Sequence, residues 1–121
     1  MRRLLPISLL VTAMASCAAM GPAAADIAIA LNPTSGKAAA YNGSWDANVV
    51  RKQALSNCGG GCRIVASRKG TCAAVVESIS TGTGVWAVAY GTTKDTAANS
   101  AWHECRRKGG VTCKTAAAIC E

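Results

Sequence analysis

Six cysteines in the C-terminal two-thirds of the chain constrain its fold more than any other feature. They are Cys58, Cys62, Cys72, Cys105, Cys113 and Cys120, and a seventh, Cys17, lies near the N-terminus. An even number of cysteines in a short secreted chain is typical of a disulfide framework. The chain also lacks Phe and has only three Trp and two Tyr, so its core consists of small side chains that offset little chain entropy. We therefore expect disulfides, each stabilising the fold by about 2–4 kcal/mol.

The N-terminal segment has the pattern of a secretory signal peptide. A short basic start, Met1–Arg3, precedes the mostly apolar run Leu4–Ala19, and Ala23–Ala25 is a small-residue cleavage site. The apolar run is interrupted by proline and serine and is too short for a convincing membrane-spanning helix. The sequence predicts a signal peptide over 1–25 and a single mature domain over 26–121, secreted or held in the periplasm or cell envelope.

Two other readings of this segment stay open. The sequence Met14-Ala15-Ser16-Cys17 loosely resembles a lipobox, in which Cys17 becomes the lipidated N-terminus, although the expected leucine is absent. A single acyl anchor needs a second membrane signal to hold firmly. The arginine pair Arg2-Arg3 is compatible with a twin-arginine signal.

The mature chain alternates strand and helix patterns, which predicts an α+β domain. A hairpin opens it, three further strands form a β-meander, and one strand closes it. Two amphipathic segments form helices, the first capped by Ser44 and the second by Thr92 or Thr93. The expected fold is an antiparallel-rich sheet of about six strands with two helices packed on it. The expected strands are 27–31, 37–41, 63–67, 72–80, 85–90 and 111–120, and the expected helices are 47–58 and 94–108.

The sequence also repeats itself, with halves at about 27–80 and 85–121. The segment from Tyr41 through its helix to Cys58 and Cys62 matches the segment from Tyr90 to Cys105 and Cys113, and Cys72 matches Cys120. Each half is then a β-α-β unit that cannot bury its apolar face alone. Two such halves packed about a pseudo-twofold axis can do so.

Equivalent halves suggest one pairing of the cysteines among the many that six residues allow. Corresponding local bridges would join Cys58 to Cys62 and Cys105 to Cys113 where each helix turns into a strand. The remaining pair, Cys72 and Cys120, would tie one half to the other.

These motifs resemble one bacterial family. The element Cys58-Gly-Gly-Gly-Cys62-Arg, the strand Cys72-Ala-Ala-Val-Val and the segment Trp86–Gly91 are similar to the secreted domain of unknown function 4189. The second helix and the closing segment Cys113–Cys120 also look like it, so the resemblance covers nearly all of the mature chain. It implies a secreted α+β domain and supplies no catalytic residues.

No catalytic, metal or cofactor site emerges from the sequence. His103 is the only histidine and has no partner for catalysis or metal binding, so we interpret it as a surface residue. The Cys58–Cys62 spacing suits zinc, but Cys105–Cys113 does not and export favours oxidation. The glycines between Cys58 and Cys62 form a turn, because no P-loop lysine or helix follows them.

The charge pattern favours a binding role. Removing the signal arginines leaves 11 basic and six acidic residues, a net charge of +5. Basic residues gather around the two cysteine corners and the turn after the first, which suggests two related patches for an anionic polymer or an acidic protein. The sequence therefore favours a non-catalytic interaction module, with a small basic secreted enzyme or toxin, or a structural envelope protein, as alternatives. The candidate surface residues are Arg63, Arg68, Lys69, Arg106, Arg107, Lys108 and Lys114.

Overall fold

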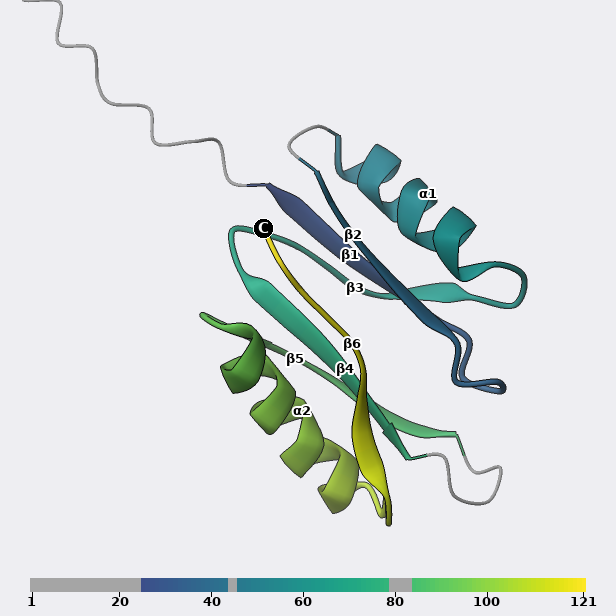
Figure 1. Ribbon diagram of the computed structural model, residues 1–121, viewed down its shortest axis with the longest axis vertical. Helices are drawn as coiled ribbons and strands as arrows, with labels where there is room; N and C mark the ends of the chain where they lie inside the picture. The colour runs from purple at the N-terminus through teal and green to yellow at the C-terminus, as the bar shows by residue number, and fades with distance from the viewer. Residues whose placement is uncertain (1–24, 44–45, 79–83) are drawn as a thin grey trace, which may run out of the picture.

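A computed structural model describes residues 25–43, 46–78 and 84–121 and has the element order β-β-α-β-β-β-α-β (Figure 1). The strands are β1 (Asp26–Leu31), β2 (Ala38–Gly43), β3 (Arg63–Lys69), β4 (Cys72–Ser78), β5 (Val85–Gly91) and β6 (Cys113–Cys120). The helices are α1 (Ala47–Cys58) and α2 (Lys94–Arg107). The predicted α+β class, with six strands and two helices, is confirmed.

The strands divide into two antiparallel three-stranded sheets rather than forming one. The first has the order β2-β1-β3 and the second has the order β5-β4-β6. The predicted β-meander is therefore wrong at its first turn, because β3 pairs with β1 and β4 pairs with β5 and β6. The short turn after Lys69 passes from one sheet to the other, so the chain segments that looked like a hairpin belong to different layers.

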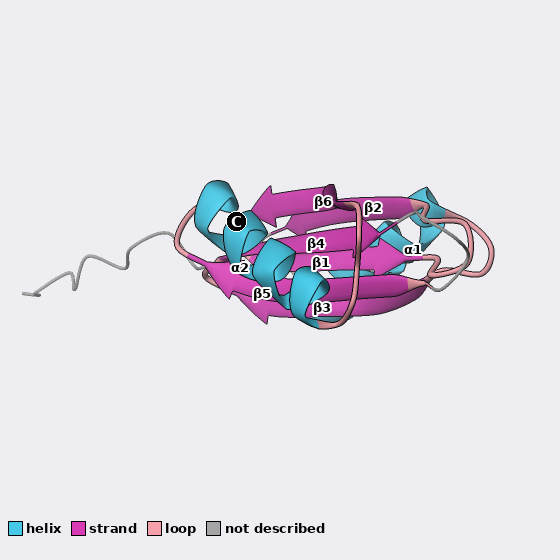
Figure 2. Cartoon of the chain, turned by 90° about the horizontal axis from the view of Figure 1, so that it is seen from below, coloured by secondary structure: helices cyan, strands magenta, loops and turns pink. Residues whose placement is uncertain are grey.

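The two sheets pack face to face with one helix on each outer side, giving four layers (Figure 1). The central strands β1 and β4 face each other in the middle of the sandwich (Figure 2). Ile27, Ile29 and Leu31 point into the space between the sheets and pack with Val75 from the opposite sheet. These large side chains bury completely and form the central core.

The helices pack against alanines on the outer face of each sheet. In the first sheet Ala28 and Ala30 contact α1, and in the second Ala87 contacts α2. The alternation of large and small residues along β1 therefore assigns each face its partner, since successive strand residues point to opposite sides. The helices present small residues in return, with Val50, Ala54 and Cys58 buried on α1 and Ala97, Ala101 and Cys105 buried on α2.

The helix starts differ in detail from the sequence prediction. Thr93 is the N-cap of α2, as expected, and its side chain accepts a hydrogen bond from the Thr96 backbone. The N-cap of α1 is Asp46, whose carboxylate accepts from the Asn48 backbone. Ser44, the predicted cap, lies outside the described residues. Asp46 suits the cap because a carboxylate satisfies a free N–H group there.

The two sheets share strand order and a local irregularity. In the first sheet the register between β1 and β3 shifts after Ile29, and in the second the register between β4 and β6 shifts after Val75. Ile29 and Val75 are the fourth residues of their strands. The repeating unit in space is thus β-β-α-β, with β4 corresponding to β1. This unit has one more strand at its start than the β-α-β unit predicted from the sequence.

One sequence match fails in this register. Tyr41 lies opposite Ala28 on the helix side of its sheet, whereas Tyr90 lies opposite Ala73 on the side facing the other sheet. Matching the tyrosines slips the alignment by one residue, and such a slip exchanges the two faces of a strand.

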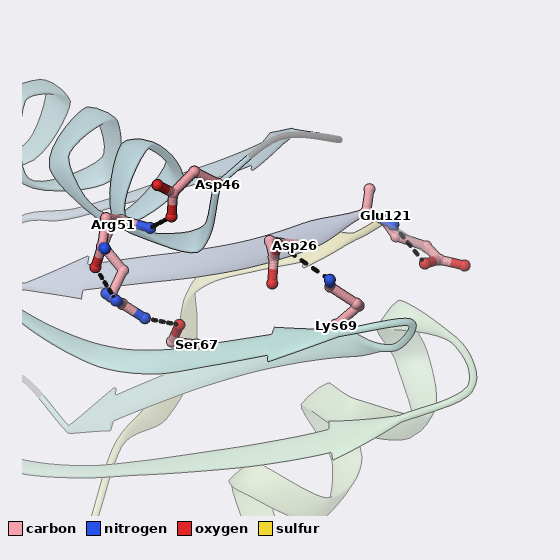
Figure 3. Close-up of polar contacts among 8 residues, drawn as sticks. Asp26, Asp46, Arg51, Ser67, Lys69 and Glu121 are labelled. Atoms are coloured by element: carbon pink, nitrogen blue, oxygen red, sulfur yellow. Dashed lines mark hydrogen bonds and ion pairs between the residues drawn. The ribbon is translucent and has the colours of Figure 1, made fainter. Parts of the chain in front are cut away.

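The predicted disulfide pairing is confirmed, with bonds Cys58–Cys62, Cys105–Cys113 and Cys72–Cys120. The role predicted for the third bond is wrong, since Cys72 and Cys120 do not tie the halves together. They lie opposite each other at the ends of β4 and β6 and close the second sheet. The matching ladder position of the first sheet is the pair Asp26 and Lys69, whose charged atoms are 3.9 Å apart (Figure 3).

No helix in the described part of the chain is long and apolar enough to cross a membrane.

Candidate functional site

Both helices end at the same end of the sandwich, together with the two disulfide corners, and we call this the corner end (Figure 1). The turn after β1 is fixed to the first corner by Asn32. Its amide donates to the Gly60 carbonyl at 3.3 Å, and its carbonyl oxygen accepts from the backbone of Thr34 and Ser35. The corner end is therefore built from segments that are distant in sequence.

Two of the predicted basic residues converge on one aromatic ring at this end. The Arg63 guanidinium from β3 lies 5.3 Å from the ring centroid of Trp86, and the Lys108 ammonium from the end of α2 lies 5.7 Å from it. Lys108 also donates to the Trp86 carbonyl at 3.2 Å. We call these three residues the Trp86 cluster. Each cation–π contact is worth about 0.5–1 kcal/mol at an exposed site, so the ring holds both cations in place.

Arg68 and Lys69 lie elsewhere, at the opposite end of β3, roughly 17–20 Å from Arg63 at the rise of a strand. The Arg68 guanidinium lies 3.8 Å from the Tyr90 ring centroid, and Lys69 is paired with Asp26 (Figure 3). The structure therefore does not bring the first predicted group of basic residues together. It splits the group, because a strand separates residues five positions apart far more than a turn does.

The remaining basic residues surround the end of α2 and the start of β6. Arg106 donates to the Val111 carbonyl at 2.8 Å and lies over Trp102, while Arg107 is paired with Glu104. Lys114 lies opposite Glu77 in the sheet. Arg106 and Arg107 are thus occupied by local contacts. Lys114 on β6 is separated from Trp86 on β5 only by Glu77 on β4, which pairs with both.

A pocket of about 60 Å³ opens beside the Trp86 cluster. The turn Pro33–Gly36 forms one wall, and the end of β4 with the start of β5 forms the other, including Glu77, Val85 and Trp86. Neither Glu77 nor Trp86 is among the site residues predicted from the sequence. The sequence did contain an indication of Glu77, because it is the only charged residue of its strand. Residues two positions apart in a strand point to the same face, so Glu77 lies on the face of Ala73 and Val75, which point into the core.

Glu77 is a buried acid whose proton affinity is altered by its surroundings. Its exposed fraction is 9 %, and burial raises the pKa of the carboxyl, with the Lys114 ammonium acting in the opposite direction. Burial disfavours the charged form because the carboxylate loses hydration. Glu77 is also the only acid or histidine among the residues lining the pocket, so a pair of groups for acid–base hydrolysis is not present in this lining.

The raised pKa predicts a stability that depends on pH. The folded protein binds the Glu77 proton more tightly than the unfolded chain, so this contribution to stability is complete below the unfolded pKa and is lost as the pH rises through the folded pKa. The free energy of unfolding of the wild type should therefore fall relative to that of Glu77→Gln as the pH rises from about 4 towards neutrality. Denaturant titrations at stepped pH measure this difference. A difference that stays constant or grows in favour of the wild type contradicts the assignment.

The other residues considered for chemistry have structural surroundings. His103 is exposed on α2, and its ring meets that of Trp102 edge-on at 5.2 Å between centroids. The six cysteines among the described residues are all bonded in disulfides. The zinc interpretation of the first corner is therefore left without thiolate ligands.

Comparison with protein-family models places residues 27–120 in a domain of unknown function, DUF4189. Neither the curated proteins nor the solved structures include a significant match to the chain. The family model covers both sheets, both helices and all three disulfides. The chain therefore belongs to the DUF4189 family.

Proposed function

We propose that this protein is an exported binding module that holds an anionic polymer at the Trp86 cluster. The observation that carries the proposal is the convergence of Arg63 and Lys108, from different layers of the fold, on one half-buried aromatic ring. Both cations are exposed and neither forms an ion pair within the described chain. Arg63 and Lys108 are therefore available to bind an anionic group of a ligand.

Three further features support export and a binding role. The N-terminal segment has the pattern of a signal peptide, the mature chain carries a net charge of +5, and three disulfides suit an oxidising compartment. A net positive charge also speeds the encounter with polyanions. The secreted or envelope location is part of this proposal.

The competing classes have weaker support. A small hydrolase or toxin needs a second catalytic group, and the lining of the pocket beside the cluster supplies only Glu77. A purely structural envelope protein needs no pair of unneutralised cations on a fixed ring. An acidic protein partner uses the same cations as a polymer does, so the experiment below includes one.

A binding experiment on the oxidised mature chain tests the proposal. Affinities for polygalacturonate, poly-L-glutamate and single-stranded DNA are measured at low and high salt for the wild type and for Arg63→Ala/Lys108→Ala. The double variant should lose about tenfold in affinity at low salt, because two charge contacts and their counterion release are removed. Salt should weaken the wild type more steeply than the variant.

A matched control removes the same charge from other surfaces. Lys52 and Lys94 are exposed on the two helices, and Lys52→Ala/Lys94→Ala lowers the net charge equally. This control should change affinity by no more than about twofold, since it acts only through long-range charge. Equal losses in the two double variants, or no salt-sensitive binding of the wild type, would overturn the proposed site.

A further inference from the structure

The Glu77 pocket carries an inference that rests on the proposed function and narrows its ligand. The pocket adjoins the Trp86 cluster, because Trp86 belongs to both. Glu77 and Trp86 are direct partners across β4 and β5, and Glu77 and Lys114 are direct partners across β4 and β6. The last row but one of the second sheet therefore carries Trp86, Glu77 and Lys114 on adjacent strands.

Glu77 places a carboxylate in the lining of the pocket. The residue is 9 % exposed and lines the pocket, and no fully buried side-chain oxygen or nitrogen of the described residues lacks a hydrogen-bond partner. Lys114 acts on it through charge alone. A carboxylate that opens into a pocket can accept a hydrogen bond from a ligand donor.

The opposite wall of the pocket is shaped around this carboxylate. Gly36 has φ +77°, and a Cβ atom there would lie 2.8 Å from one Glu77 carboxylate oxygen. The turn thus approaches the acid as closely as a backbone without a side chain permits. The approach leaves a pocket of about 60 Å³ beside the carboxylate.

The charges around the pocket select the kind of donor that enters. A phosphate, sulfate or carboxylate group is repelled by Glu77 itself. An ammonium group is disfavoured by Arg63, Lys108 and Lys114, which lie around the same end. A neutral O–H donor avoids both penalties and satisfies the carboxylate.

We infer that the Glu77 pocket binds a sugar hydroxyl and that the ligand of the Trp86 cluster is an acidic polysaccharide. A sugar unit with both hydroxyl and anionic substituents places one hydroxyl on Glu77 while its anionic group meets Arg63 and Lys108. A polynucleotide fits less well, because two cations already lie over the Trp86 ring on which a base would stack.

The experiment compares two carboxylate polymers that differ in hydroxyl groups. Polygalacturonate carries carboxylates and hydroxyls, whereas poly-L-glutamate carries carboxylates without hydroxyls, and single-stranded DNA provides a third polyanion. At equal salt the wild type should bind polygalacturonate about tenfold more tightly than the other two, since hydrogen bonds to a charged acceptor discriminate at that level.

Glu77→Gln should change the affinities for polygalacturonate and for poly-L-glutamate in opposite directions. The substitution removes a negative charge, so charge alone predicts slightly tighter binding of every polyanion. Loss of the carboxylate acceptor should instead weaken polygalacturonate binding about tenfold. Glu77→Asp keeps the charge but withdraws the acceptor from the pocket, and it should weaken polygalacturonate binding while leaving polyglutamate binding unchanged.

The outcomes separate this inference from the proposed function. If Arg63→Ala/Lys108→Ala weakens binding but Glu77→Gln tightens all three polymers, the hydroxyl site is overturned and the cationic site stands. Polyglutamate or DNA binding that equals polygalacturonate binding overturns the inference in the same way. If no polymer shows salt-sensitive binding to the wild type, both proposals fail. Circular dichroism and thermal unfolding confirm that each variant is folded before its affinities are compared.

Discussion

Replacing Cys72 and Cys120 together by alanine is expected to lower the free energy of unfolding by about 4 kcal/mol. The bond closes the largest of the three loops, with a sequence separation of 48 residues. A cross-link restricts the unfolded chain more strongly as its loop lengthens, so this bond removes the most disorder from the unfolded state. Chemical denaturation of the oxidised variant, monitored by Trp fluorescence, measures the loss.

The other two bonds provide the matched comparison. Their separations are 4 and 8 residues, so Cys58→Ala/Cys62→Ala and Cys105→Ala/Cys113→Ala should cost only about 2–2.5 kcal/mol on the same scale. The first sheet already forms without a disulfide at the ladder position of Cys72 and Cys120, where Asp26 and Lys69 stand instead. A larger loss from either local bond than from Cys72–Cys120 contradicts this ranking.

Ile29→Ala is the second substitution with a large expected effect, a loss of about 2–5 kcal/mol in the free energy of unfolding. The Ile29 side chain is fully buried between the sheets, at 0 % exposure, in the middle of β1. Its neighbours are held by two hydrogen-bonded sheets and have little freedom to close the cavity. Thermal and denaturant unfolding of the oxidised protein give the value.

An exposed valine is the control for Ile29→Ala. Val49 on α1 has 53 % of its surface exposed, and Val49→Ala should change stability by less than about 0.5 kcal/mol. A small loss for Ile29→Ala would mean that the two sheets do not share one packed core, which would contradict the four-layer arrangement.

The sequence carried enough information for the elements and the disulfides but not for their arrangement in layers. Cysteine spacing and repetition led to the observed bonds, and the pattern of the chain predicted the two helices close to their observed bounds. Strand pairing depends on contacts distant in sequence, which local pattern does not encode. The short Lys69–Cys72 connection looked like a hairpin because a turn between sheets has the same composition as a turn within one.

The candidate site shows the same division. The basic residues were visible in the sequence, but only the fold decides that Arg63 and Lys108 meet while Arg68 lies at the far end of β3. Glu77 was present as one acidic residue among six. Its importance depends on the turn Pro33–Gly36, which comes from the other half of the chain and covers it.

The central claim is that the corner end, and the Trp86 cluster in particular, is the binding surface. The most direct test is an NMR titration of the ¹⁵N-labelled, oxidised protein with short oligogalacturonates, following backbone amides and the Trp indole N–H signals. We expect the signals of the Trp86 indole and of the Arg63 and Lys108 amides to shift together and saturably, while those of the Asp26 and Lys69 amides stay unchanged. Shifts centred on Asp26 and Lys69, or no saturable shifts at Trp86, would contradict it.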